Sequence, residues 1–274
     1  MSKARREVLM IGRVGDNSLH RSWIDGAGEG RIFDLHLSYY GNMADPFPDR
    51  ESDVTLSHDP GPKFPGLSAC LAKLDGRLKS YRWLCFVDDD IWGVYPTWRT
   101  FFQVVNRLQP SLAQPALKRG SFYSHDITLE RPTYMARWTN FVEIMNFCFR
   151  MDFFEKIRTS FDLNESGWGL DQLWAQQAEP RERTLAIVDQ APVLHTRAVG
   201  RGGLYDVISG GLAAAHADHA AITTEKLRPI TYAAILPDGT LYSGPQLNRR
   251  LYIPRRIKKL RQLLKIYSVT PPQF

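Results

Sequence analysis

The 274-residue sequence contains no hydrophobic run of the length that a membrane-spanning helix requires. Such a helix needs about 20 consecutive apolar residues, and no stretch of this chain approaches that length. The opening residues, MSKARREVLMIG, also lack the long apolar segment of a secretory signal peptide. We therefore expect a cytoplasmic protein without a transmembrane anchor.

Cysteine is scarce, and repeats and low-complexity segments are missing. The three cysteines, Cys70, Cys85 and Cys148, lie among apolar neighbours and form no CxxC pair. This pattern excludes a disulfide framework and predicts buried thiols of a reducing compartment. With 43% hydrophobic and 12% aromatic residues, the chain is predicted to fold into a globular core.

Acidic residues are absent from the C-terminal segment. From Arg249 onward the chain has eight Lys or Arg and no Asp or Glu, so 27 basic and 29 acidic residues remain in the rest. The net charge of +6 therefore describes a tail rather than the fold, and it does not support a nucleic-acid-binding surface.

Short apolar runs alternate with segments of helical periodicity. We predict strands over 7–14, 31–41 and 83–90, and later over 184–196, with a strand followed by a helix in 140–157. Helices are predicted over 63–78, 97–108 and 169–178, and a loop over 42–62. This order indicates an α/β fold, in which ligands bind beyond the carboxyl ends of the strands.

Three consecutive aspartates end the predicted strand 83–90. Because like charges at this spacing oppose one another's ionisation, a positive partner is expected beside them. Asp88 and Asp90 form an Asp-x-Asp pair suited to Mn²⁺ or Mg²⁺, while Asp89 points differently because strand side chains alternate. The alternative is a solvated acidic turn without function.

The segment ESGWGLDQLWA, residues 165–175, offers a base and a stacking platform. Glycines flank Trp168, and Asp171 falls in the first turn of the predicted helix. Asp171 is a candidate general base with Trp168 as a platform for a sugar. The alternative is an ordinary acid at the start of a helix.

The segment VLHTRAVGRGG, residues 193–203, combines a histidine with two arginines. Arg197 and Arg201 in a glycine-rich loop favour an anion site, and this loop is also a candidate lid over the active site. His195, at the end of a strand, is suited to complete the coordination of a metal. The alternative is a core histidine that bonds to the backbone.

Taken together, YRWLCFVDDDI, LAQPAL, TNFVEIMNFCFRMDFF, SGWGLDQLWA and VLHTRAVG resemble nucleotide-sugar glycosyltransferases of the GT-A fold. They are more specifically similar to the family called domain of unknown function 707, which often has Asp-Glu-Asp where this chain has three aspartates. The resemblance covers residues 81–200. It implies a Rossmann-like, mixed and mostly parallel sheet flanked by helices, in one catalytic domain (1–245) with a donor half (1–110), an acceptor half (111–205) and a basic helical tail (246–274).

The resemblance also implies roles for individual residues. Asp88 would contact the ribose or the sugar, Asp90 and His195 would ligate Mn²⁺ or Mg²⁺ with Asp88 beside them, and Asp171 would act as the base of an inverting enzyme. The implied donor site also includes Asp89, Lys63, Arg197, Arg201, Gly12 and Arg13.

Glu143 is an acid among apolar neighbours and should have a partner, since burying an unpaired carboxylate is costly. The two interpretations are an ion pair with Arg150 or Arg137 and a contact with the hydroxyl of an acceptor. Gln114 and His125 are further candidates for acceptor binding, beside Trp168.

The tail 249–267 places apolar side chains on one helical stripe among basic residues. It is typical of a helix lying on an anionic membrane, which would put the protein on the inner face of that membrane, or of a helix packed on the body.

We expect a metal-dependent glycosyltransferase, inverting, that moves a sugar from a nucleotide donor to a glycan or lipid-linked saccharide in surface polysaccharide synthesis. Two alternatives remain. One is a binding module without activity. The other is a metal-dependent phosphohydrolase, which Trp92 disfavours because such enzymes have Thr or Val at that place.

Overall fold

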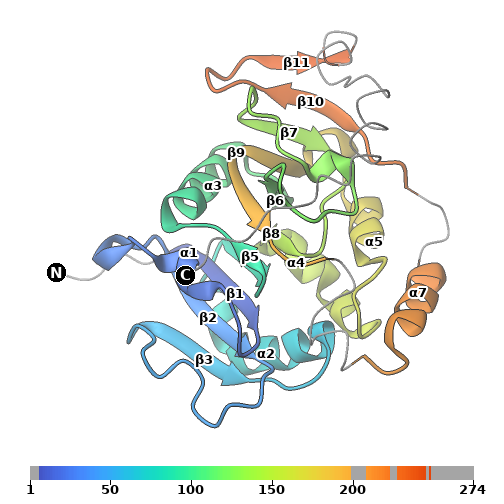
Figure 1. The fold of residues 1–274 in the computed structure, drawn as a ribbon. Helices are drawn as coiled ribbons and strands as arrows, with labels where there is room; N and C mark the ends of the chain where they lie inside the picture. Colours follow the sequence, from blue (N-terminus) through green and yellow to red (C-terminus); the bar gives the residue numbers. More distant parts are fainter. Residues whose placement is uncertain (1–5, 199–207, 223–226, 245–246, 248–274) are drawn as a thin grey trace.

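The computed structural model describes residues 6–198, 208–222, 227–244 and 247, which form a single sheet with helices on both faces (Figure 1). The sheet runs in the order β11-β10-β7-β9-β6-β8-β4-β1-β2-β3, with β5 paired to β9 beside this path. The strands are β1 (Val8–Val14), β2 (Phe33–Tyr39), β3 (Val54–His58), β4 (Trp83–Asp88), β5 (Ile91–Trp92), β6 (Leu112–Leu117), β7 (Ala136–Thr139), β8 (Asn146–Arg150), β9 (Leu185–His195), β10 (Thr231–Ile235) and β11 (Leu241–Ser243).

Parallel pairing dominates the N-terminal part of the sheet. Strands β3, β2, β1 and β4 are parallel neighbours, and the β1–β2 ladder is the longest of all. Strand β8 then runs antiparallel between β4 and β6, and β6 pairs with β9 in parallel. The carboxyl ends of β1, β2 and β4 therefore meet at one edge, which is where a ligand binds in a sheet of this kind.

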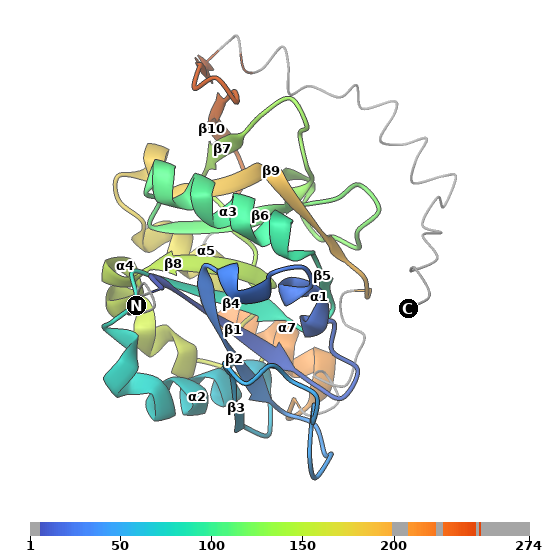
Figure 2. The same cartoon turned by 90° about the vertical axis from the view of Figure 1, so that its left-hand side faces the viewer.

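The helices divide between the two faces of the sheet (Figure 2). One core layer includes α1 (His20–Ile24) and α3 (Tyr95–Leu108), and the other includes α2 (Lys63–Leu78), α4 (Met151–Ile157) and α5 (Leu170–Gln177). Helix α7 (Gly211–Ile222) packs beside α5. Strand alternation explains the division, because Cys85 and Val87 of β4 face the first layer while Leu84 and Phe86 face the second.

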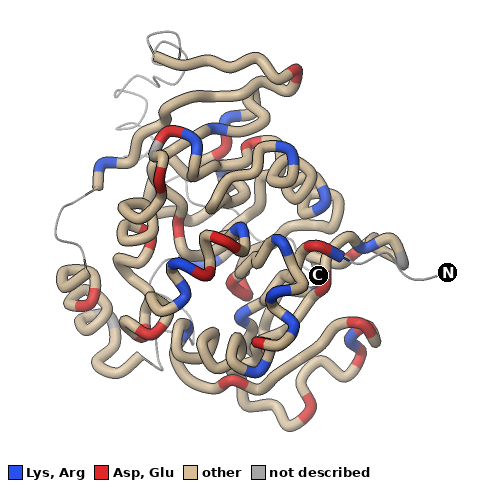
Figure 3. Tube along the Cα trace, turned by 180° about the vertical axis from the view of Figure 1, so that it is seen from behind, with Lys and Arg blue, Asp and Glu red and all other residues tan. Residues whose placement is uncertain are grey.

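Charged residues are interspersed over the described part of the chain, as Figure 3 shows. No helix among the described residues has the length and apolar character needed to cross a membrane. The tail predicted over 246–274 lies outside the described residues, apart from Leu247, which is buried beside Tyr134 and Ala234. The predicted domain boundaries therefore stay predictions.

The predicted α/β class, with a mixed sheet flanked by helices, is confirmed. The helix predicted over 63–78 has those bounds, and the three cysteines are free and buried. The prediction of a loop throughout 42–62 is wrong, because this segment contains β3. This edge strand is half exposed and its side chains do not alternate clearly between apolar and polar, so the sequence pattern did not reveal it.

Candidate active site

A cavity of about 330 Å³ opens at the carboxyl ends of β1, β2 and β4. Most of the residues predicted from the sequence line it. They are Arg13, Lys63, Asp88, Asp89, Asp90, His125, Glu143, Trp168, Asp171, His195 and Arg197. Segments that lie far apart in the sequence thus meet in one place, where the three aspartates, Glu143 and Asp171 line the same cavity.

Asp88 forms an ion pair with Lys63, the first residue of α2. Lys63 Nζ lies 2.6 Å from Asp88 Oδ2 and also donates a hydrogen bond to the carbonyl oxygen of Ile144. Burial raises the pKa of Asp88 to about 6, although the charge of Lys63 opposes that change. Lys63 is therefore a fixed positive charge at the floor of the cavity.

Asp89 is buried and bound by three donors. Its Oδ2 accepts hydrogen bonds from the Tyr40 hydroxyl at 2.6 Å and from the Gly15 N–H at 3.1 Å. Its Oδ1 lies 3.0 Å from Arg197 NH1. Burial and the charge of Asp90 raise the pKa of Asp89, against the opposing effect of Arg197. Asp89 therefore connects β2, the turn after β1 and the segment after β9.

Asp90 lies beside His195 in the cavity. His195 Nε2 lies 3.4 Å from Asp90 Oδ2, and His195 Nδ1 lies 2.8 Å from the carbonyl oxygen of Phe122. Because only an N–H can bond to that carbonyl, Nδ1 carries a proton. Burial opposes the ionisation of Asp90, but the hydrogen bond and charge of His195 outweigh it and lower the pKa of Asp90.

Backbone pairing fixes the spacing between Asp90 and His195. Ile91 of β5 pairs with His195 of β9, and the Thr196 N–H donates to the Asp90 carbonyl oxygen at 3.0 Å. The two side chains thus come from adjacent antiparallel segments, and their separation depends on strand register rather than on flexible contacts.

Two further buried carboxyl groups line the cavity. Glu143 is 6% exposed and Asp171 is 9% exposed. Burial, reinforced by the charge of Asp171, raises the pKa of Glu143 to about 7, and burial raises that of Asp171 to about 6. Asp171 Oδ1 accepts a hydrogen bond from the Gln172 N–H at 2.9 Å, which orients it in the first turn of α5.

Helix α7 contributes two histidines to the cavity. The His216 ring meets Trp168 edge to face, with ring centroids 4.9 Å apart, and His219 Nε2 lies 2.9 Å from Gln172 Nε2. Gly167 and Gly169, which flank Trp168, both have positive φ. This conformation favours glycine, and it lets the backbone turn tightly around Trp168.

Arg13 lines the cavity and bonds to the segment that precedes α2. Its guanidinium donates to the carbonyl oxygens of Asp59 and Gly61, each at 2.6 Å, and to Ser38 Oγ at 3.1 Å. These bonds fix the segment that leads into α2 and so position Lys63. Gly66 leaves room for Arg13, because a Cβ there would lie 2.2 Å from NH2.

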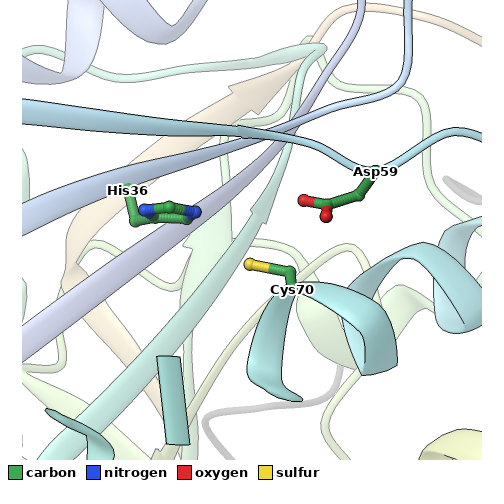
Figure 4. A group of neighbouring side chains, drawn as sticks. All are labelled: His36, Asp59 and Cys70. Atoms are coloured by element: carbon green, nitrogen blue, oxygen red, sulfur yellow. The ribbon is translucent and has the colours of Figure 1, made fainter. Parts of the chain in front are cut away.

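A buried polar network lies close to Arg13. His36, Asp59 and Cys70 point toward one another between β2, the end of β3 and α2 (Figure 4). They are the only group of three His, Cys, Asp or Glu among the described residues whose ligand atoms all lie within 4.8 Å of one another. Ser57 Oγ donates to Asp59 Oδ2 at 2.5 Å and lies 2.8 Å from His36 Nε2.

The Ser57 hydroxyl therefore links the imidazole to the carboxylate of this network. Since the serine gives its one proton to Asp59, His36 Nε2 must donate to the serine oxygen, and no free lone pair remains on that nitrogen. Burial lowers the pKa of His36 to about 4 and raises that of Cys70 to about 12. We interpret the group as a hydrogen-bond network that ties α2 to the sheet.

Several predicted residues lie elsewhere. Gly12 packs inside β1 against Trp23, where a Cβ would lie 2.6 Å from the indole ring, and it is not among the residues that line the cavity. Gln114 is fully buried and does not line the cavity; its Oε1 accepts a hydrogen bond from the Glu143 N–H at 2.6 Å. Arg201 and the predicted lid over 199–207 lie outside the described residues.

The predicted ion pair of Glu143 with Arg150 or Arg137 is wrong. Arg137 forms a buried ion pair with Asp189 at 2.8 Å, and Arg150 pairs with Asp152 at 2.6 Å. Glu143 instead faces the cavity.

Other lining residues had not been predicted: Tyr40, Ser124, Ser166, Gln172, His216 and His219. Tyr40 could have been found, because it follows the strand next to β1 and so reaches the same edge. The α7 histidines lie in the alanine-rich segment GLAAAHADHAAI, which carries no pattern that indicates a binding residue.

No model of a known protein family matches the chain, so the resemblance to domain of unknown function 707 is not confirmed. A comparison with curated proteins finds no match either. Among solved structures, residues 1–349 of TarS from S. aureus are similar at 12% identity with a TM-score of 0.47, over 69% of this chain and 60% of that one.

The TarS structure in complex with UDP-GlcNAc is similar at 11% identity with a TM-score of 0.48, over 79% of this chain and 71% of that one. A197 from STIV is similar at 12% identity with a TM-score of 0.38, over 87% and 93% of the two chains. This chain thus spans 60% of the first TarS structure's length. Similarity this distant carries no functional argument, so the function must be inferred from the cavity.

The residues around Asp90 fit a divalent cation. Asp90 Oδ1 is buried and has no hydrogen-bond partner. With Nδ1 protonated, His195 directs Nε2 at the Asp90 carboxylate, and a proton or a cation between them relieves the repulsion of facing lone pairs. Mg²⁺ and Mn²⁺ accept such donors and commonly complete their coordination with water and substrate phosphates. Asp88 departs from the predicted ligand set, because its Oδ2 is paired with Lys63.

Proposed function

We propose that this chain is a metal-dependent glycosyltransferase that moves a sugar from a nucleotide diphosphate donor to a hydroxyl group of an acceptor. The observation that supports it is the composition of one cavity. Cationic side chains, the Asp90–His195 pair and two buried carboxyl groups with raised pKa values all line it. The cationic side chains and the Asp90–His195 pair suit a diphosphate with a cation, and the two carboxyl groups suit an acceptor that must lose a proton.

Asp90 and His195 would bind Mn²⁺ or Mg²⁺, with Asp88 beside them. When bound, the cation supplies positive charge that neutralises the diphosphate as it leaves. Lys63 and Arg197 contribute further positive charge in the same cavity. Arg197 is bonded to Asp89 and to the carbonyl oxygen of Asn17, so its guanidinium is oriented before a donor arrives.

Asp171 is the proposed base. As the acceptor oxygen forms its bond to the anomeric carbon, the bond from that carbon to the diphosphate breaks, and the hydroxyl proton passes to the Asp171 carboxylate. A pKa of about 6 leaves most of this carboxylate ionised at neutral pH while making it a stronger base than an ordinary aspartate. Direct displacement of this kind inverts the configuration at the anomeric carbon.

The experiment is metal-dependent release of nucleotide from a panel of nucleotide sugars. We expect release from at least one donor with Mn²⁺ or Mg²⁺ and its loss in Asp90→Ala. Asp171→Asn keeps an oxygen that can accept from the Gln172 N–H, so donor binding should stay near normal while transfer falls by about 100-fold or more.

Glu155→Gln, on the exposed side of α4, is the control variant. Binding of nucleotide without release from any donor, with or without metal, would favour the alternative of a binding module.

The acceptor that we propose is a glycan or a lipid-linked saccharide in surface polysaccharide synthesis. Membrane association would rest on the basic segment 249–267, which lies outside the described residues. Binding of the full chain to anionic vesicles, and its loss at high salt, tests that part separately.

A further inference from the structure

The cavity carries more acid than its own cations can balance. Among the described lining residues, five are acids and three are permanently charged bases, Arg13, Lys63 and Arg197. Lys63 pairs with Asp88, and Arg197 pairs with Asp89. A donor diphosphate would add further negative charge, which the proposed cation offsets. Asp90, beside which the proposed cation would bind, and Glu143 and Asp171 are therefore left without a permanently charged partner.

Neither Glu143 nor Asp171 has an ion pair within the described part of the chain. Lys63 and His195 lie near enough to influence the pKa of Glu143, but no Lys, Arg or His nitrogen among the described residues lies within 4.0 Å of either carboxylate. Lys63 and Arg197 are committed to aspartates after β4, and the Arg13 guanidinium donates to Ser38 and to backbone carbonyl oxygens. The described part of the chain thus supplies no charged partner to these two carboxyl groups.

Glu143 also has an unused hydrogen-bond acceptor. Its Oε2 is buried and has no hydrogen-bond partner, while the carboxyl group bonds to Ser124 and the backbone N–H bonds to Gln114. A buried carboxylate oxygen without a donor costs free energy, which a bound ligand can recover by donating to it. Because Glu143 lines the cavity and its backbone is fixed, its carboxyl group is placed to accept a hydrogen bond from a ligand.

We propose that Glu143 anchors a protonated primary amine of the acceptor, so that the acceptor is an amine-bearing molecule such as an amino sugar. The proposal rests on the transferase function given above. An ammonium group brings the positive charge that these carboxyl groups lack and three N–H donors, of which one would bond to Glu143 Oε2. A hydroxyl brings one donor and no charge, and an N-acetyl group brings one N–H and no charge.

Such an anchor also separates the tasks of the two carboxyl groups. A cation bound at Glu143 favours the ionised form of the neighbouring Asp171 and so keeps it available as a base. Trp168, on the same cavity, offers an aromatic surface for the apolar face of a sugar ring. An acceptor with an amine and a hydroxyl a few bonds apart would satisfy both carboxyl groups at once.

The test is calorimetric binding of glucosamine, glucose and N-acetylglucosamine to the full chain at pH 7, with and without nucleoside diphosphate and Mn²⁺. We expect glucosamine to bind at least tenfold more tightly than either neutral sugar. Equal affinities, a preference for a neutral sugar, or no detectable binding of glucosamine at millimolar concentration would overturn the proposal.

Two variants sharpen the result. Glu143→Gln keeps the shape of the side chain and should abolish the preference for glucosamine, whereas the exposed control Glu155→Gln should retain it. A preference that survives in a folded Glu143→Gln would also overturn the proposal. The comparison of the three sugars on the unaltered chain remains decisive if that variant does not fold.

The same measurements separate the anchor from the transferase function. Metal-dependent nucleotide release without any preference for glucosamine would remove the anchor and leave the transferase. A preference for glucosamine in a chain that binds no nucleotide would support the amine anchor at Glu143 and contradict the transferase function.

Discussion

Each of the three aspartates after β4 has a different basic partner, of which His195 is charged only when both of its ring nitrogens are protonated. Asp88 pairs with Lys63, Asp89 with Arg197, and Asp90 with His195. The partners come from α2 and from the chain after β9, so folding itself brings the positive charges to the cluster. Three like charges can therefore follow one buried strand at an acceptable cost, and Asp89 contributes by orienting Tyr40 and Arg197.

Glu143 should make the stability of the fold depend on pH. Its pKa in the folded chain is about 7, against an ordinary value near 4.5, so the folded chain binds its proton more tightly than the unfolded chain does. Between these two pH values the folded chain binds more protons, and the free energy of unfolding must fall as pH rises, by up to about 3 kcal/mol in total.

Glu143→Gln has no titrating group at this position, so its free energy of unfolding should not show this decrease as pH rises. We expect the variant and the unaltered chain to be similarly stable at pH 4.5, with the variant more stable at pH 8, as measured by urea denaturation at both values. Glu155→Gln, whose carboxyl group is exposed, is the matched control. A stability difference between Glu143→Gln and the unaltered chain that is the same at both pH values would contradict the assignment.

At the scale of elements, the turn before α5 packs closely against the start of α2. Gly167 has a φ of +78°, and a Cβ at this position would lie 1.8 Å from the ring of Phe64. The Phe64 N–H also bonds to the carbonyl oxygen of Glu165. The glycine therefore sets how closely the Trp168 turn approaches Lys63, the neighbour of Phe64.

Gly167→Ala should destabilise the fold by about 2–4 kcal/mol, because the positive φ and the overlap with Phe64 both oppose a Cβ. Urea denaturation measures the change. The control is Gly76→Ala on the exposed side of α2, where a Cβ meets nothing within 4 Å and where alanine should stabilise the helix by about 0.5–1 kcal/mol. Equal effects at the two positions would show that the contact with Phe64 is unimportant.

Elements with strong periodicity could be predicted from the sequence, and their ends located much of the site. Helix α2, strand β4 and strand β9 were recognisable, and they carry Lys63, Asp88 and His195. The ion-pair partners of charged side chains were not predictable, because they depend on tertiary contacts that leave no local pattern in the sequence. Arg137, for example, pairs with Asp189 and not with Glu143. The short strands β3, β5, β7, β10 and β11 were not predicted either, because their pairing also depends on tertiary contacts and they are too short to show a clear sequence pattern.

At the scale of the whole molecule, the cavity draws on segments from both ends of the described chain. Tyr40 and Asp89 come from the parallel part of the sheet, Glu143 and Asp171 from the middle of the chain, and His216 from α7. A ligand that contacts these segments together binds only the folded state, so binding should stabilise the entire fold.

Addition of Mn²⁺ with a nucleoside diphosphate should therefore raise the melting temperature. At a ligand concentration 100 times Kd, binding adds about 2.7 kcal/mol, which corresponds to a shift of roughly 5–10 °C for a chain of this size. Differential scanning fluorimetry with Mn²⁺ alone, nucleotide alone and both together measures it, with chelator as control. Asp90→Ala should lose the part that requires metal; a shift that is indifferent to chelator would argue against a metal-bound diphosphate.

The pairing of Ile91 with His195 also limits how the chain can change in length. Side chains along a strand alternate between its two sides, so inserting or deleting one residue near the end of β9 would turn the imidazole away from Asp90 while leaving most of the apolar layers intact. The exposed residues 48–50, in the segment before β3, are not bound by such a register. Single-residue length changes should therefore be tolerated there. Around His195 they would produce a chain that folds but whose imidazole no longer lies beside Asp90.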